Sequence, residues 1–305
     1  AIIYTDLGID PLTYMLSFLR IAPTQAAFWG NPIPPQSPSI DYFILGEHHS
    51  VKQRFFQSQV VRLRGIGAYY FQPMITNQKA RKQDVAQMIY GETGRLLDLG
   101  THNFALVTQS LCKLHPQFDT TLRSLLLANP ALIVIITAGK GMLWGNQIWL
   151  RLKALQKLHG PGESWLDRIF ILKRLAANDY MSLIKSATLM LDSFPYSGFT
   201  TSIEALVLNV PIVALSGSSP SSSQTAGLYS NMDRKFFEKC CVATSTEIYL
   251  KMCNDLIQRP EYNHYVRRHI GTTVHKLFKQ ESAVKSWISF LYRAVNKIPP
   301  AGAPS

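Results

Sequence analysis

Small and hydroxyl-bearing residues in the second half of the chain gather where a helix is predicted to begin. The turn comprises Ser197, Gly198, Phe199, Thr200 and Thr201. The first backbone N–H groups of a helix lack partners within it, so such a turn can bind an anion. Glu204 lies one helical turn further along, where its carboxylate can accept hydrogen bonds from sugar hydroxyls. These residues predict a site for a nucleotide diphosphate rather than for free phosphate.

Apolar runs on both sides of this turn predict the elements that position it. The predicted order is a strand at 188–191, a helix at 201–208 and a strand at 211–215. Upstream, an apolar strand at 104–107 leads directly into residues 108–115. Ligands of parallel α/β sheets bind beyond the carboxyl ends of the strands. We therefore expect residues 108–115 and 194–201 to lie on one rim of a sheet.

Alternating strand and helix patterns along the chain predict an α/β fold with two Rossmann-like parallel-sheet halves. Further strands are predicted at 2–4, 25–29, 40–45, 60–63, 131–137 and 169–172. Helices are predicted at 11–20, 117–128, 150–158, 179–185, 247–259, 261–277 and 281–295. The continuous apolar run 131–137 is typical of a strand covered on both faces. Because the chain begins inside a strand-like run, we expect the first half to be incomplete at its N-terminus.

Changes in patterning predict the domain boundaries. Residues 1–85 are assigned to the C-terminal part of the first domain, and residues 86–100 to a weakly patterned join. Residues 101–275 are assigned to the nucleotide-binding domain. The predicted C-terminal helix occupies 276–297, and the Pro- and Ala-rich residues 298–305 are predicted to form a disordered tail.

The composition is that of a globular protein with a basic surface. Hydrophobic residues make up 47% of the chain and charged residues 16%, which excludes a disordered chain. The net charge of +12 is compatible with nucleic acid, an acidic substrate or an anionic surface as a partner. The basic residues are scattered and accompany no nucleic-acid motif, so we expect no nucleic-acid partner. Nucleic-acid binding remains an alternative that rests on charge alone.

Cysteine spacing and hydropathy indicate the cellular compartment of the protein and whether it binds a metal. The four cysteines contain no Cys-x-x-Cys pair, which favours buried free thiols in a reducing compartment. No apolar run approaches the ~20 residues that a membrane span requires. We expect a cytoplasmic, or nuclear, protein without a membrane partner and without a bound metal. The adjacent His48 and His49 have no further ligand at metal-binding spacing, and a surface loop is the favoured interpretation.

A series of stretches resembles the catalytic region of the O-GlcNAc-transferase-like glycosyltransferases, the family of SPINDLY and O-GlcNAc transferase. The stretches are 6–14, 20–25, 28–32, 40–44, 109–116 and 192–201, and they occur in the order found in the family. The resemblance implies the GT-B fold, with this chain as its C-terminal catalytic region. It also implies a nucleotide-sugar donor and no cofactor. Members often carry N-terminal tetratricopeptide repeats, which the full protein is then expected to have.

The resemblance assigns roles to residues of the second half. Lys113 matches a lysine that contacts the donor diphosphate, and Gln109 matches a glutamine beside it. Thr200 and Thr201 match the hydroxyl pair at the diphosphate-binding helix. Other matches are Glu204, at the position of an aspartate that binds ribose, and Tyr180, at the position of a histidine near the uridine. Surface exposure of Lys113, helix capping by the threonines and packing of Tyr180 are the structural alternatives.

Several residues depart from the family pattern. Asn31 replaces a frequent histidine, Gly65 stands where the animal enzyme has a histidine, and Phe199 replaces a polar or histidine residue. A Ser-rich run at 218–224 follows Gly217, where relatives carry an arginine. These departures favour a second hypothesis, in which the chain is a degenerate relative that binds nucleotide or protein without catalysis.

The first hypothesis is an inverting, metal-independent transferase that moves N-acetylglucosamine from UDP-GlcNAc to Ser or Thr hydroxyls of proteins. GDP-fucose or UDP-glucose as donor, or an asparagine acceptor, are the alternatives within the same fold. A lysine and a helix N-terminus would stabilise the charge on the leaving diphosphate, which makes Lys113 the main catalytic candidate. Asp10 is a second catalytic candidate, as a base near the acceptor, although it also precedes a predicted helix at Pro11.

Overall fold

The structure is a computed structural model that describes residues 1–50, 56–74, 82–94, 103–139, 142–160 and 164–296. The chain divides into two compact units. The first comprises Ala1–Phe71, Gly217–Asn231 and Lys276–Ser305, and the second comprises Gln72–Ser216 and Met232–His275. This division differs from the expected boundaries, because residues 72–94 join the second unit while residues 217–231 join the first. Residues 95–100 of the predicted join and the tail 298–305 lie outside the described residues.

The first unit is built on a parallel sheet of four strands in the order β1-β2-β3-β4. Its elements are β1 (Ile2–Tyr4), α1 (Pro11–Leu16), β2 (Gln25–Phe28), β3 (Tyr42–Gly46), β4 (Gln59–Leu63) and α10 (Glu281–Val295). The core of the sheet contains Ala26, Ile44 and Leu63, and the side chains of Trp287 and Phe290 from α10 pack against it. The far C-terminal helix is therefore part of this unit.

The second unit contains a six-stranded parallel sheet in the order β10-β9-β8-β5-β6-β7. Its strands are β5 (Phe104–Val107), β6 (Ile133–Thr137), β7 (Ile169–Leu172), β8 (Leu189–Leu191), β9 (Ile212–Leu215) and β10 (Val242–Ala243). Every residue of β5 and β8 is buried, as expected for strands covered on both faces. These two strands are neighbours, which places the segments that follow them side by side.

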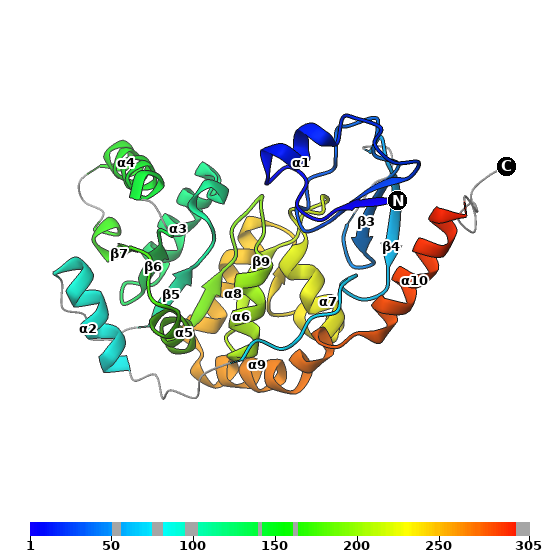
Figure 1. The fold of residues 1–305 in the computed structure, drawn as a ribbon. Helices are drawn as coiled ribbons and strands as arrows, with labels where there is room; N and C mark the ends of the chain where they lie inside the picture. The colour runs from blue at the N-terminus through cyan, green and yellow to red at the C-terminus, as the bar shows by residue number, and fades with distance from the viewer. Residues whose placement is uncertain (51–55, 75–81, 95–102, 140–141, 161–163, 297–305) are drawn as a thin grey trace. The chain divides into compact units, whose positions relative to one another are not determined.

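Helices surround this second sheet (Figure 1). They are α2 (Lys82–Thr93), α3 (Pro116–Ala128), α4 (Met142–His159), α5 (Ala177–Ser186), α6 (Thr200–Val207), α8 (Thr246–Gln258) and α9 (Pro260–Thr273), with short 3-10 turns at Leu111–Lys113, Leu166–Arg168 and Val274–Leu277. Helix α7 (Gln224–Phe237) is divided between the units and is interrupted by a non-helical Asp233. The sequence analysis missed α2, α7 and β10.

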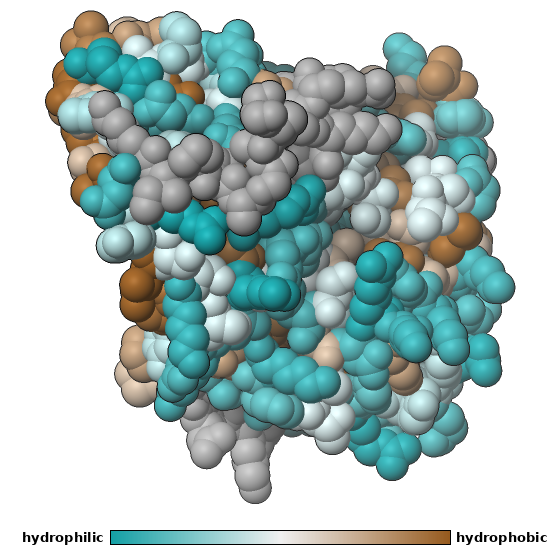
Figure 2. Space-filling view, turned by 90° about the vertical axis from the view of Figure 1, so that its right-hand side faces the viewer, coloured by the Kyte–Doolittle hydropathy of each residue, from teal (hydrophilic) through white to brown (hydrophobic). Residues whose placement is uncertain are grey.

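Helix α1 is shorter than predicted and its apolar face is exposed. It ends at Leu16 instead of residue 20, and none of its residues is buried. The side chains of Leu12 and Met15, which gave the helical pattern, are 66% and 67% exposed. Elsewhere, Figure 2 shows a face on which hydrophilic residues predominate and hydrophobic residues occur in smaller groups. Among the described residues, none of the helices combines the length and the apolar character that crossing a bilayer requires.

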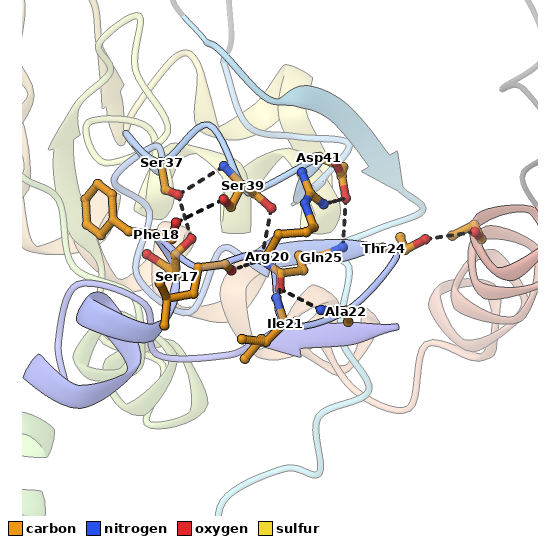
Figure 3. A network of polar contacts seen from close by, with 12 residues as sticks. Ser17, Phe18, Arg20, Ile21, Ala22, Thr24, Gln25, Ser37, Ser39 and Asp41 are labelled. Atoms are coloured by element: carbon orange, nitrogen blue, oxygen red, sulfur yellow. Dashed lines mark hydrogen bonds and ion pairs between the residues drawn. The ribbon is translucent and has the colours of Figure 1, made fainter.

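The loop between α1 and β2 is held by one buried glutamine (Figure 3). The Gln25 side-chain oxygen accepts hydrogen bonds from the N–H groups of Ile21 and Ala22, at 2.8 and 3.1 Å. Its side-chain nitrogen donates to the carbonyls of Leu19 and Ser39, both at 3.0 Å. All the polar capacity of a fully buried side chain is thereby satisfied by backbone groups of this loop and, through Ser39, of the loop between β2 and β3.

We predict that Gln25→Met destabilises the first unit, because methionine fills the same space but leaves four backbone groups without their partner. The expected loss is about 2–3 kcal/mol in the free energy of unfolding, measured by urea titration. The control is Gln36→Met, a change at an exposed glutamine that should leave this free energy within about 0.5 kcal/mol. Equal effects of the two changes would contradict the role given to Gln25.

Candidate functional site

A buried carboxylate organises the turn that follows β8. One oxygen of Asp192, Oδ2, accepts a hydrogen bond from the Ser197 hydroxyl at 2.5 Å, and the other, Oδ1, accepts one from the N–H of Gly198 at 2.8 Å. The carbonyl of Asp192 accepts a hydrogen bond from the Tyr249 hydroxyl at 3.1 Å. Asp192 is completely buried, so its charge must be held by such donors. The predicted turn residues Ser197 and Gly198 are therefore fixed by Asp192, a residue to which the sequence analysis gave no role of its own.

The rim that carries this turn also carries Gln109, as predicted. Gln109 follows β5, is 2% exposed, and donates from Nε2 to the Thr201 hydroxyl oxygen at 2.8 Å. A Cβ atom at position 198 would lie only 2.1 Å from Gln109 Nε2, so the glycine makes room for this side chain. Because the Thr201 oxygen accepts from Gln109, its own proton remains able to donate to a ligand.

Lys113 lies in the 3-10 turn Leu111–Lys113 after β5. The next residue, Leu114, forms an antiparallel bridge with Pro195, which ties this segment to the turn. The ammonium nitrogen of Lys113 lies 4.4 Å from the centre of the Tyr196 ring, a cation–π contact. Burial lowers the pKa of Lys113, and the Asp192 carboxylate opposes this shift. Among the described residues, no carboxylate forms an ion pair with this lysine.

Helix α6 begins at the turn and presents two of the predicted hydroxyls. Thr200 is its exposed first residue, Thr201 is half-buried, and the N-cap residue Phe199 supplies no side-chain hydrogen bond. The Phe199 side chain is instead buried. A helix start without a side-chain cap retains the positive end of its dipole for an anion.

Glu204 and Tyr180 form a pair on the adjoining helices α6 and α5. The Tyr180 hydroxyl donates to Glu204 Oε2 at 3.1 Å. Burial raises the pKa of Glu204, while the hydrogen bond from Tyr180 opposes the shift. Burial and the charge of Glu204 raise the pKa of Tyr180, so the phenol keeps its proton. The structure thus brings together two residues that the sequence analysis assigned separately to ribose and uridine.

Asp10 lies in the first unit, where it caps α1. Its carboxylate accepts a hydrogen bond from the N–H of Thr13 at 2.7 Å. The neighbouring Leu7 carbonyl accepts a hydrogen bond from the Asn31 side chain at 2.9 Å, across Gly8, which has a φ of 87°. Asn31, one of the departures from the family pattern, therefore supports the loop that presents Asp10. A catalytic role for Asp10 stays a prediction.

Other departures in the first unit also have structural roles. Gly65 has a φ of 61°, and a Cβ atom there would lie 2.1 Å from the Gln280 side chain, so a larger residue would be strained and would displace that side chain. In the Ser-rich run, the Ser223 hydroxyl donates to the Ser219 carbonyl at 2.9 Å and accepts from the N–H of Ser50 at 3.2 Å. The run is a hydrogen-bonded turn, which explains its composition without a ligand.

The structure corrects two predictions, one about the adjacent histidines and one about the cysteines. The interpretation of His48 and His49 as a surface loop is wrong, because His49 is 1% exposed and burial lowers the pKa of His48 to about 4. The expectation of buried thiols holds for Cys240, Cys241 and Cys253 but not for the exposed Cys112. Among the described residues, no group of three or more His, Cys, Asp or Glu side chains is arranged to hold a metal ion.

Comparison with solved structures identifies the architecture. An O-GlcNAc transferase mutant from Thermobaculum terrenum matches with a TM-score of 0.72 and 18% identity, over 97% of this chain and 54% of that chain. Anabaena HepE in complex with UDP and glucose matches with a TM-score of 0.57 and 12% identity, over 88% of this chain and 71% of that chain. A UDP-forming trehalose-phosphate synthase from Burkholderia xenovorans gives 0.56 and 11%, over 98% and 74%.

These similarities confirm the predicted GT-B fold and, at the level of fold, the resemblance to O-GlcNAc transferase. This chain spans about half (54%) of the Thermobaculum protein. No protein-family model matches the sequence, and comparison with curated proteins finds no match.

We predict that Gly198→Ala displaces the Gln109 side chain from Thr201, because the added methyl group occupies its place. The expected cost is about 1–2 kcal/mol in the free energy of unfolding. In the Gln109→Ala background the same change should cost less, giving a coupling of about 1 kcal/mol in a double-mutant cycle followed by urea unfolding. Additive effects would show that the two residues do not compete for this space.

Proposed function

We propose that this chain is the catalytic region of a glycosyltransferase that transfers N-acetylglucosamine from UDP-GlcNAc to Ser or Thr hydroxyls of proteins, with inversion and without a metal. The observation that carries the proposal is the Asp192-centred turn with Lys113 and Gln109 on the same rim of the second sheet. The GT-B fold supports it, because solved structures of this fold include a protein in complex with UDP and glucose. The choice of sugar and acceptor rests on the resemblance to O-GlcNAc transferase.

The residues of the rim have the chemistry that this reaction requires. Transfer from a UDP-sugar leaves negative charge on the diphosphate as the glycosidic bond breaks. Lys113 and the uncapped start of α6 supply fixed positive charge for that group. The Thr200 and Thr201 hydroxyls can donate hydrogen bonds to its oxygens. Glu204, oriented by Tyr180, offers a carboxylate to the ribose hydroxyls.

A second candidate function is nucleotide binding without transfer. It is favoured by Asn31, whose side chain is committed to the Leu7 carbonyl and has no acid–base capacity. Incubation of the full-length protein with UDP-GlcNAc, UDP-glucose and GDP-fucose separates the two functions. Sugar transfer to lysate proteins, detected by mass spectrometry at Ser, Thr or Asn, supports the first. Absence of hydrolysis and transfer with every donor, together with thermal stabilisation by UDP, supports the second.

We predict that Lys113→Ala lowers the rate of sugar transfer by about 10²–10³-fold, because the leaving diphosphate loses its cationic partner. The rate is measured as UDP release at saturating donor, and thermal denaturation checks that the variant is folded. Lys251→Ala removes an exposed charge on α8 and should leave the rate unchanged. A rate equal to that of the unaltered protein in Lys113→Ala would overturn the assignment of the donor site.

We predict that Glu204→Ala weakens UDP binding about tenfold, because the ribose hydroxyls lose a charged acceptor. The affinity for 2′,3′-dideoxy-UDP, which lacks those hydroxyls, should be the same in both proteins. Isothermal titration calorimetry measures both ligands, with Glu261→Ala on the surface of α9 as the matched loss of a carboxylate. An equal loss of affinity for the two ligands would show that Glu204 acts elsewhere.

A further inference from the structure

A pocket with polar side chains lies at the amino ends of β5 and β8, the two central strands of the six-stranded sheet. It has a volume of about 480 Å³ and is lined by residues that include Lys185, Thr188, Asn263, His264 and Arg267. Thr188 directly precedes β8, whereas the candidate donor residues follow the carboxyl ends of β5 and β8. The pocket is therefore separate from the candidate donor site.

The guanidinium of Arg267 forms one wall of this pocket in a fixed position. Its Nε donates to Asn263 Oδ1 at 2.7 Å, and its Nη2 donates to the carbonyls of Ala187 and, at 3.0 Å, of Thr188. Among the described residues, no carboxylate pairs with it. Burial lowers the pKa of Arg267 to about 10, so the group remains charged at neutral pH. The result is a partly desolvated cation without a counter-ion.

Several acceptors at the pocket are already paired, whereas three of its cationic or imidazole donors are not. Asn263 Nδ2 donates to the carbonyls of Thr188 and Leu256, at 3.0 and 2.9 Å. The Thr188 hydroxyl donates to Asn103 Oδ1 at 3.2 Å. Within the part of the chain that the structure describes, Nη1 of Arg267 and the side chains of Lys185 and His264 have no hydrogen-bond partner. No Asp or Glu lines the pocket, so its unused polar capacity is suited to an anion.

We propose that this pocket binds the phosphate group of a small phosphomonoester. A phosphate oxygen accepts from Arg267 Nη1, and Lys185 and His264 contribute further charge or hydrogen bonds from the rim. The volume exceeds that of a phosphate alone, which leaves room for the organic part of the ligand against Leu256 and Pro260. The site does not depend on the proposed glycosyl transfer, because it uses none of the residues of the donor rim.

Binding of inorganic phosphate and of phenyl phosphate to the full chain tests the proposal, by calorimetric titration at constant ionic strength. Lys185→Gln should weaken binding of both probes at least fivefold, and Lys185→Gln with His264→Gln should weaken it further. Lys185 and His264 are exposed, so circular dichroism should show an unchanged fold. Phenyl phosphate should bind more tightly than inorganic phosphate, since its ring contacts the apolar wall.

Two matched variants locate the binding. Lys251→Gln removes an exposed lysine outside the pocket, and Lys113→Gln removes the lysine of the donor rim. Lys251→Gln should retain the affinity of the unaltered protein for both probes, and Lys113→Gln should leave unchanged the part of the binding that Lys185→Gln removes. An unchanged affinity in the Lys185 and His264 double variant would overturn the proposal. So would a loss in Lys113→Gln alone, which would place the phosphate at the donor rim.

Discussion

The buried carboxylate of Asp192 is the constraint on which the candidate donor site depends. A carboxylate without exposure to water is stable only if donors surround it, and the chain supplies the Ser197 hydroxyl and the N–H of Gly198. Satisfying this charge folds residues 193–198 back onto the end of β8. The same fold sets Gly198 against Gln109 and Pro195 beside Leu114. One electrostatic requirement thus brings together segments that are far apart in the sequence.

Burial at this rim shifts the pKa values of Lys113 and Glu204 so that their charged forms are disfavoured. A ligand that interacts with the charged forms would oppose these shifts. Burial lowers the pKa of Lys113, and the charges of Asp192 and Cys112 oppose this shift. A bound diphosphate would add negative charge and stabilise the ammonium form. Glu204 shows the opposite case, because burial raises its pKa and hydroxyl donors restore its charge. In the proposed function, the diphosphate and the hydroxyls of the donor favour the charged forms of Lys113 and Glu204.

Much of this arrangement follows from sequence patterns, and its failures have identifiable causes. The apolar runs of β5 to β9 predict parallel strands, because a strand buried on both faces needs continuous apolar residues. The rim shared by residues 108–115 and 194–201 then follows from strand adjacency. The role of Asp192 does not follow, since nothing local in the sequence distinguishes a buried carboxylate from an exposed strand end. Helix α2 was missed because its apolar positions are sparse; Val85 and Ile89 are its buried apolar residues among those whose burial is described.

Asn31, Gly65 and the Ser-rich run lie in the first unit and Phe199 is buried in the turn, and each has a structural role. Asn31 keeps a hydrogen-bond donor directed at the Leu7 carbonyl, so the loop that carries Asp10 retains its shape although acid–base capacity is lost. Gly65 leaves room for the Gln280 side chain, which a Cβ atom at this position would displace. The residues proposed to bind the donor diphosphate and ribose lie in the second unit, with Glu204 at the position of the family's aspartate and Tyr180 at that of its histidine. The two candidate functions therefore differ on the acceptor side. A chain that binds UDP normally but fails to transfer sugar would have lost the chemistry of the first unit, while the Asp192-centred turn would remain intact.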